Sequence, residues 1–557
     1  MLPYLFQGIF TASWLALFLL VWFIVKRRSH KLPLPPGPDP APLIGNLHQM
    51  PKSHRWLHFF RWSRNAHGPI MYLNLGGQPF VVLSTHEAAS DLLVKRGALY
   101  SHRPRFVMAG EMVTKGMHHL LRQYDANYRL HHRLEAPLLS TQAAKRYRPV
   151  QELESRQLLF DLLGNHEDGE KDGEEGVDFY HQLERSRQTK SANYRTQKPY
   201  KLQLYIIFSS EIVSVDIFPV LNVLPYRLAP WKAEAEALYV LERDLHIGNF
   251  KRGLESQAWN LSKQIKPVCS NNTEANTAGV SDEELAFDLG IIADAALDTS
   301  TMTLSWFITA WVTHGSSFVS KAQCQLDQAV GRDRLPQFEN RSCLTYIDAI
   351  VNEVLRWRPI AAGGIPHRTL QEDTYKGYRI PAGSIVVGSH FAITRDESVF
   401  GADVESFVPE RWLLDCEEDG QTATATTSKN RHTLKSLPLT GFGFGRRLCT
   451  GRHIALNGQF IIIARLLWAF DVQLTAGEDE SEVVKAGAQW GSMMEDDVGC
   501  IDAFLIRPKP FKVVFKPRGP WVRKLILEQG NPHEKVDLNG LLAGLAVDNK
   551  INEVNKQ

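Results

Sequence analysis

One cysteine lies in a loop whose composition suits a metal-bound thiolate. The segment from Phe442 to Gly451 reads FGFGRRLCTG and contains Cys449. Glycines let backbone N–H groups approach a sulfur closely, and such donors, together with the start of a following helix, stabilise a thiolate. A thiolate suits iron and pushes electron density toward O–O bond cleavage. Since a buried structural cysteine usually lies in an apolar helix or strand, the pattern favours Cys449 as an iron ligand.

Two further groups of polar residues lie on helices that read as apolar. Glu353 and Arg356 are three residues apart within 343–357 and therefore share one helix face. Asp298 and Thr299 lie within 281–313, where Ser281 and Glu284 predict a capping box at the helix start. Taken alone, each pair is more typical of a solvated surface. The apolar helices around them favour buried or functional roles.

These segments resemble, in order along the chain, the motifs of the cytochrome P450 family. The cysteine loop is similar to FxxGxRxCxG, a pattern expected by chance in about 2 of 10,000 sequences of this length. Residues 295–300 (AALDTS) resemble the oxygen-binding turn (A/G)Gx(D/E)T(T/S), and the Glu353 helix resembles ExxR. Residues 407–412 (FVPERW) resemble FxPERW. The resemblance covers roughly residues 30–520 and is nearest to fungal microsomal members, in the group similar to O-methylsterigmatocystin oxidoreductase.

The resemblance assigns a role to each motif residue. Cys449 is implied as the axial iron ligand of haem b, shielded by Phe442. The remaining implied haem contacts are Arg447 and His367 at the propionates, with Gly451 in the ligand loop. Asp298 would supply protons to bound dioxygen and Thr299 would orient them. Glu353, Arg356 and Arg411 would form a buried, fully paired network that holds the core behind the haem.

The sequence departs from the family in the helix written YGxxWRxHRR. Residues 124–133 read YDANYRLHHR, so Tyr128 replaces the tryptophan and His132 replaces an arginine that bind a propionate. Tyrosine still donates one hydrogen bond, and histidine is partly charged at neutral pH. We expect Tyr128 and His132 to contact the haem more weakly. The four histidines nearby have no carboxylate or cysteine in register, so we expect no metal site there; they are His118, His119, His131 and His132.

The N-terminal segment predicts attachment to a membrane. Residues 5–25 are almost all apolar, long enough for one transmembrane helix, and Lys26, Arg27 and Arg28 follow at once. A cleaved signal peptide would have its charge before the apolar run. We therefore expect a lumenal tip (1–4), an anchor (5–25), a basic, proline-rich hinge (26–42), a cytoplasmic haem domain (43–520) and a C-terminal tail (521–557). The expected location is the endoplasmic reticulum membrane.

The expected fold is mainly α (α+β), with a helical haem domain and small β-sheets. Residues 70–84 read as a β-hairpin turning at Gly76-Gly77, and 375–387 as a second hairpin. Residues 86–96 and 454–469 read as helices. Residues 164–176 and 417–436 are polar and read as loops. The six cysteines form no CxxC pair, which indicates reduced thiols.

The resemblance implies a monooxygenase that inserts one atom of O2 into a hydrophobic small molecule, in fungal secondary metabolism. About 110 residues follow Cys449, too few for flavin and nicotinamide domains, so we expect electrons from NADPH through a separate cytochrome P450 reductase, with cytochrome b5 as a further donor. The net charge of +2 gives no sign of nucleic-acid binding. Two alternatives stay open: a haem-binding protein that has lost turnover, and a reductase-independent haem-thiolate isomerase or dehydratase.

Overall fold

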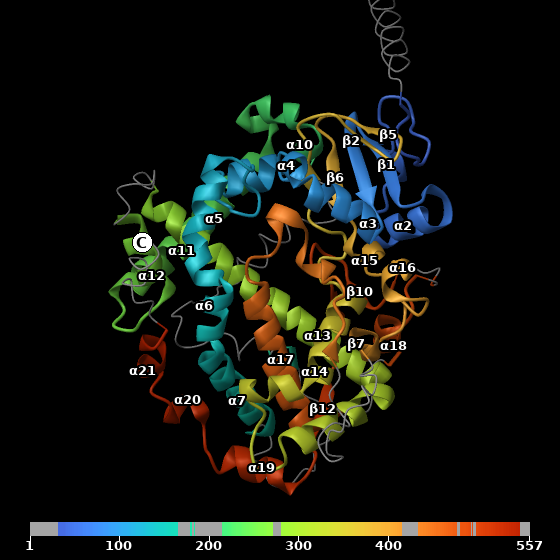
Figure 1. The fold of residues 1–557 in the computed structure, drawn as a ribbon. Helices are drawn as coiled ribbons and strands as arrows, with labels where there is room; N and C mark the ends of the chain where they lie inside the picture. The colour runs from blue at the N-terminus through green and yellow to red at the C-terminus, as the bar shows by residue number, and fades with distance from the viewer. Residues whose placement is uncertain are drawn as a thin grey trace, which may run out of the picture.

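The computed structural model describes residues 32–164, 179–180, 183, 214–270, 280–414, 433–475, 480–491, 493 and 497–545. The described part is mainly helical with small sheets, as expected (Figure 1). The longer helices are α2 (Arg55–Trp62), α5 (Ala126–Leu139), α6 (Thr141–Arg146), α7 (Arg148–Gly164), α11 (Pro230–Glu255), α12 (Leu261–Ser270), α13 (Asp282–Ala329), α14 (Thr345–Trp357), α17 (Arg452–Ala469) and α18 (Glu480–Gly487). Shorter ones are α3 (His86–Ala89), α4 (Gly97–Tyr100), α10 (Ser214–Ile217), α15 (His390–Ile393) and α16 (Glu397–Phe400).

Helices α13, α14 and α17 pack together at the centre of the molecule (Figure 1). Thirteen of the residues of α17 are buried, which fits its almost continuous apolar sequence. The main hydrophobic cluster joins these helices to α7 and to the strands β9 (Phe470–Leu474) and β12 (Val513–Pro517). Helices that are hydrophobic on every side must lie inside a large core. The core therefore holds α13 and α17, the two helices that carry the candidate chemistry.

Helix α13 begins where the sequence predicted and ends later. Ser281 accepts a hydrogen bond from the backbone of Glu284 and the Glu284 side chain accepts one from Ser281, so the capping box is confirmed. The helix continues to Ala329, beyond the predicted end at residue 313. It is continuous through Ala296, where the family motif has glycine. Alanine favours the helix by about 1 kcal/mol over glycine, which supports this regularity.

One four-stranded sheet contains the first predicted hairpin. Strands β1 (Ile70–Leu75) and β2 (Gln78–Leu83) pair antiparallel, which confirms the turn at Gly76-Gly77. The sheet order is β1-β2-β6-β3, with β6 (Ile385–Gly388) parallel to β2 and β3 (His367–Arg368) antiparallel to β6. A long connection carries the chain from β2 to β6 through α13 and α14. The small strand pairs β7 (Leu413–Leu414) with β8 (Thr433–Leu434) and β10 (Cys500–Ile501) with β11 (Arg507–Pro508) lie apart from it.

The predicted hairpin at 375–387 is wrong in its pairing. Strand β5 (Tyr378–Ile380) pairs with β4 (Asp373–Tyr375) around a turn at Lys376-Gly377. The next strand, β6, joins the larger sheet instead of β5. Because Pro381 has no N–H to give to a strand ladder, it marks the change from one sheet to the other.

The ends of the described chain lie against the globular domain. The backbone N–H of Tyr72 donates to Pro36, so the proline-rich segment is docked on β1. After residue 520, helices α19 (Pro520–Leu527), α20 (Pro532–Lys535) and α21 (Leu538–Ala543) contact α7. The predicted membrane segment 5–25 is outside the described residues. Within the described residues, none of the helices combines the length and apolar character that a membrane crossing requires.

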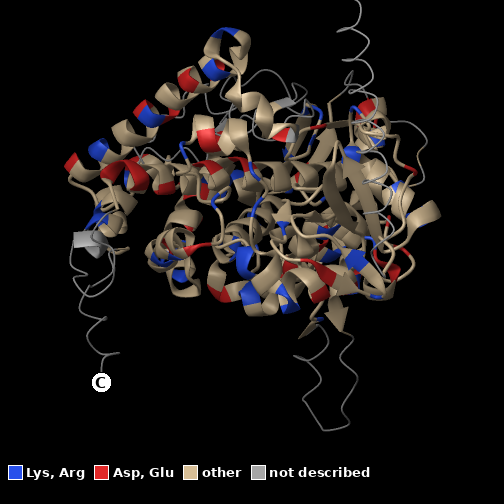
Figure 2. Ribbon diagram, turned by 90° about the horizontal axis from the view of Figure 1, so that it is seen from above, with Lys and Arg blue, Asp and Glu red and all other residues tan. Residues whose placement is uncertain are grey.

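Charged residues of both signs are interspersed over the described ribbon (Figure 2). This distribution agrees with the formal net charge of +2. Four cysteines whose side chains the structure describes are free; they are Cys324, Cys343, Cys449 and Cys500. The predicted loops at 164–176 and 417–436 fall largely outside the described residues.

Candidate functional site

The candidate ligand, Cys449, lies in the loop that leads into α17. Two short 3₁₀ turns precede it, at Thr440–Phe442 and Gly445–Arg447, and Gly451 is the N-cap of the helix. The N–H of Cys449 donates to the carbonyl of Phe442 at 2.9 Å, which closes the loop. Phe442 itself is half-buried against the main core. The loop is therefore held in one shape by its own backbone and by the helix that follows.

The glycine at position 445 is required by geometry. Gly445 has φ +56°, a left-handed conformation, and a Cβ there would lie 2.1 Å from the carbonyl oxygen of Leu93. Any side chain at this position would clash with that backbone in addition to straining its own. The close approach packs the cysteine loop against the helical segment 86–95, far away in sequence.

Opposing effects act on the thiol of Cys449. Desolvation by neighbouring protein atoms raises its pKa, while backbone N–H groups of Gly451 and Arg452 and the charge of Arg452 act to lower it. Cys449 is nevertheless exposed on one side. A cation that coordinates the sulfur would remove the thiol proton, and the two N–H donors would then stabilise the anion. This arrangement suits a metal ligand better than an inert core cysteine.

The acid–alcohol pair lies on the helix that packs against α17. The side-chain amide of Gln459, in α17, donates to the carbonyl of Ser300 in α13 at 2.9 Å. Beside that contact, Asp298 and Thr299 are half-buried and Ala295 is exposed. The hydroxyl of Thr299 donates to the carbonyl of Ala295 at 2.7 Å. The polar turn of α13 and the helix after the cysteine loop are thus fixed side by side.

Two arginines near this loop have no carboxylate partner among the described residues: Arg103 is buried and Arg447 is half-buried. Arg103 is 1% exposed and donates to the carbonyls of Leu120 and Pro366. Arg447 donates to the carbonyls of Ser101 and Arg122. Burial, and then the charge of Arg447, lower the pKa of Arg103 to about 9. In the described part of the chain neither guanidinium forms an ion pair, so both fit a buried ligand with two carboxylates, such as the propionates of a haem.

The other predicted propionate contacts are close to Arg447. Its guanidinium lies 3.8 Å from the ring centroid of Tyr128, and the Tyr128 hydroxyl is 3.4 Å from the carbonyl of Arg446. The ring of His132 lies 5.8 Å from that of Tyr128. Burial and the charge of Arg447 lower the pKa of His132. His132 is therefore a neutral neighbour, and the arginines carry the positive charge.

His367, the third predicted basic contact, is buried on strand β3. Its Nδ1 lies 2.7 Å from the carbonyl of Tyr100. Burial and the charge of Arg103 hold its pKa well below the usual range. As the Nδ1 proton is used on the backbone, a neutral His367 has no second proton to donate to a propionate. Positively charged Arg103 fits that task better.

The charged group of α14 forms one buried network. Glu353 accepts two hydrogen bonds from Arg356 at 2.8 Å and one from Arg411 at 3.1 Å. The backbone N–H of Val408 and the indole of Trp412 complete its shell. Glu353 is 0% exposed and Arg356 2%. The geometry is that of a structural clamp between α14 and the segment 407–412.

Sequence reasoning missed two groups of residues around the site. The burial of Arg103 without an ion pair appears only in three dimensions. A cluster of His119, Glu135 and Asp288 brings together potential ligand atoms from three elements. The expectation that the nearby histidines lack carboxylate partners is wrong, because it considered positions in the sequence rather than neighbours in space.

Comparisons with known proteins agree with the geometry. A family model described as cytochrome P450 matches residues 35–492. The chain is 36% identical to cytochrome P450 monooxygenase aneD of Aspergillus aculeatus, over 95% of this chain and 96% of that protein. It is 35% identical to cytochrome P450 monooxygenase drtD of Aspergillus calidoustus, over 95% and 94%. It is 32% identical to cytochrome P450 monooxygenase FrzL of Cladobotryum, over 97% of each.

Proposed function

Since this chain belongs to the cytochrome P450 family and is a haem-thiolate monooxygenase, we propose that Cys449 is its iron ligand and that α13 forms the oxygen side of its pocket. One observation carries the proposal: Cys449 is exposed at the start of α17, with two backbone N–H groups directed at its sulfur, and α17 is bonded to the polar turn of α13. The ligand loop thus leads directly into a helix that contacts the helix of the acid–alcohol pair.

The bound haem supplies the activation of dioxygen and its insertion into a C–H or C=C bond. Cys449 and the guanidiniums of buried Arg103 and half-buried Arg447 would hold the cofactor. The N–H groups of Gly451 and Arg452 stabilise the thiolate and so limit its basicity. Half-buried Phe442 covers the ligand loop and restricts water there. Exclusion of water alone raises the pKa of the thiol, so metal coordination and the two N–H donors would keep the sulfur anionic.

Proton delivery falls to Asp298 and Thr299. Asp298 exchanges protons through its carboxylate, and the Thr299 hydroxyl accepts a proton from one neighbour while donating to another. In the structure that hydroxyl donates to Ala295 at 2.7 Å. Rotation away from this carbonyl would direct it to a bound water. Asp298 and Thr299 are therefore proposed as the residues that move and orient protons.

The substrate proposed is a hydrophobic small molecule of fungal secondary metabolism. Support comes from the apolar residues of the segment 107–113, which pack against α11, and from the names of the fungal relatives, which are monooxygenases. An apolar cavity with few polar groups binds such compounds. The relatives' names do not specify a substrate.

Electrons are proposed to come from NADPH through a separate cytochrome P450 reductase, with cytochrome b5 as a second donor. Arg446 is exposed next to the ligand loop, and the Arg452 side chain is close to the carbonyl of Cys449. Basic groups at this position suit an acidic partner and speed its association. Residues 5–25 are proposed to anchor the chain in the endoplasmic reticulum membrane with the haem domain on the cytoplasmic side. Carbonate extraction of cell membranes tests this, because an anchored chain stays in the pellet.

The activity is tested with the haem-loaded full chain, a reductase, NADPH and ¹⁸O2. Extracts rich in apolar metabolites serve as substrates, and products are read by mass spectrometry. We expect at least one NADPH-dependent product that carries one ¹⁸O atom. Products that appear without NADPH and without the label would instead support an isomerase or dehydratase, and a normal haem spectrum with no product would support a protein without turnover.

A further inference from the structure

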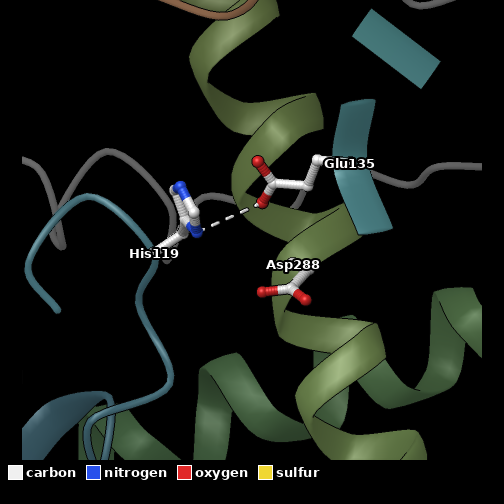
Figure 3. A group of neighbouring side chains, drawn as sticks. All are labelled: His119, Glu135 and Asp288. Carbon is white, nitrogen blue, oxygen red and sulfur yellow. Dashed lines mark ion pairs between the residues drawn. The ribbon is translucent and has the colours of Figure 1, made fainter. Parts of the chain in front are cut away.

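Three potential metal ligands from three different elements lie close together (Figure 3). His119 comes from the loop before α5, Glu135 from α5 and Asp288 from the first turns of α13. One ligand atom from each residue lies within 4.8 Å of the other two. The Nδ1 of His119 is 3.6 Å from Oε1 of Glu135. None of these residues has a role in the proposed oxygen chemistry.

Burial makes the cluster unusual. Glu135 is 2% exposed and Asp288 is 0% exposed. Oδ1 of Asp288 and Nδ1 of His119 are buried and have no hydrogen-bond partner among the described residues. Buried polar atoms in native proteins nearly always have a partner, and an unpaired one often marks an ion or water. Two such atoms in one cluster therefore point to a ligand.

A neighbouring histidine fixes the orientation of one carboxylate. Nδ1 of His131 lies 2.5 Å from Oδ2 of Asp288, and both side chains are fully buried. This hydrogen bond uses Oδ2 and leaves Oδ1 for another interaction. Metal-binding carboxylates are commonly held in this way by a second residue behind them.

Burial disfavours the ionised forms of the two carboxylates in the cluster. Burial, followed by the charge of Asp288, raises the pKa of Glu135 well above its ordinary value. Burial also raises the pKa of Asp288. The nearby guanidinium of Arg122 opposes both shifts, but it is 3.7 Å from a third carboxylate, that of Glu284. A divalent cation between the two buried carboxylates would stabilise their ionised forms, so its binding would release protons.

We propose that His119, Glu135 and Asp288 bind one divalent transition-metal ion, with Zn²⁺ as the best match. One imidazole and two carboxylates suit Zn²⁺, whose ligands lie about 2.0–2.2 Å from the metal and whose fourth position takes water. An imidazole ligand disfavours Mg²⁺ and Ca²⁺, which prefer oxygen. Binding requires the three ligand atoms to contract from their present spacing, through small side-chain rotations.

The site would join the loop before α5 to α13. The ring of His119 stacks on Tyr128 at 4.5 Å, and Tyr128 in turn contacts Arg447. The metal would therefore hold in place a loop that packs on the predicted propionate contacts. This inference does not depend on the monooxygenase reaction, because metal binding is measured without turnover.

Zinc binding to the haem-loaded full chain tests the inference. The protein is treated with a chelator, dialysed and titrated with Zn²⁺ against a chromophoric competitor, and zinc is counted by elemental analysis. We expect one tight zinc per chain, and about 100-fold weaker binding in Asp288→Asn and in Glu135→Gln. The matched control is Glu242→Gln, since Glu242 is another buried carboxylate, on α11, whose oxygens have no hydrogen-bond partner among the described residues. It should bind zinc like the wild type.

The reduced carbonyl spectrum of each variant checks that it has folded around haem, and His119→Gln, in a loop, is the reserve variant if either acid substitution prevents folding. X-ray absorption of the zinc-loaded wild type should show nitrogen and oxygen neighbours with imidazole scattering. Equal zinc binding in the wild type and the ligand variants would overturn the inference. So would an absence of tight binding, or sulfur in the zinc shell.

Discussion

Replacing Glu353 by glutamine should strongly destabilise the folded chain. The Glu353 carboxylate is fully buried and accepts hydrogen bonds from Arg356, Arg411, Trp412 and the backbone of Val408. Glutamine keeps the volume but removes the negative charge, and its NH2 group faces donors. Arg356 would then lose its counter-charge, and Arg411 would keep only the ion pair with Asp403.

The magnitude follows from what the arginines retain. Arg356 keeps the carbonyls of Thr394, Val404 and Ser406, and Arg411 keeps its contact with Asp403. Removing one partner of a buried ion pair costs about 3–5 kcal/mol. With a urea slope of about 3 kcal/mol per molar, the unfolding midpoint should fall by about 1–1.7 M.

Urea unfolding followed by tryptophan fluorescence measures this change. Glu397→Gln is the matched control, because Glu397 pairs with Arg64 on the surface and both side chains are about half exposed. An exposed pair contributes about 0–1 kcal/mol, so the control should move the midpoint by less than about 0.3 M. If the Glu353 and Glu397 variants shifted the midpoint equally, the network would not have the energetic role described here.

Three further substitutions test the site and the pH response. Thr299→Ala should keep the reduced carbonyl spectrum but lower the rate of product formation by about 100-fold. The control is Thr303→Ala, which removes a similar i−4 hydrogen bond one turn later and should leave that rate unchanged. Equal losses of rate in the two variants would contradict a special role for Thr299. Gly445→Ala should abolish haem incorporation, measured as the haem-to-protein ratio, because the added Cβ would lie 2.1 Å from the Leu93 carbonyl oxygen. A normal ratio would argue against this account of the loop. Burial lowers the pKa of His390 to about 4. Below about pH 6.5 the unfolded chain therefore binds a proton at this residue that the folded chain does not bind. The free energy of unfolding should decline by about 3 kcal/mol as the pH falls from 6.5 to 4. The decline in urea midpoint should be smaller in His390→Gln, and identical pH profiles would refute this assignment.

Local patterns predicted a large part of the fold. The capping box at Ser281, the hairpin at Gly76-Gly77 and the helix after Cys449 all depend on residues within a few positions of one another. Local hydrogen bonds and side-chain periodicity decide such features. The network at Glu353 could also be predicted from the sequence, because an apolar helix must bury the charges that it carries.

Features that depend on long-range contacts were missed. Pairing of β6 with β2 joins residues about 300 positions apart, and nothing in the local sequence distinguishes it from a pairing with β5. Asp288 joins His131 over a separation of 157 residues. A sequence position does not reveal whether a carboxylate lies in register with a histidine on another helix. The burial of Arg103 without a carboxylate partner among the described residues likewise depends on the packed structure.

The reduced carbonyl difference spectrum of Cys449→Ser tests the central claim most directly. In the wild type, a thiolate-bound haem should give a strongly red-shifted Soret band. The control variant Cys500→Ser alters another cysteine in the described part of the chain and should retain this band. In Cys449→Ser the shifted band should vanish. A Cys449→Ser protein with the same shifted band, or a wild type that binds no haem, would contradict the assignment of Cys449 as the iron ligand.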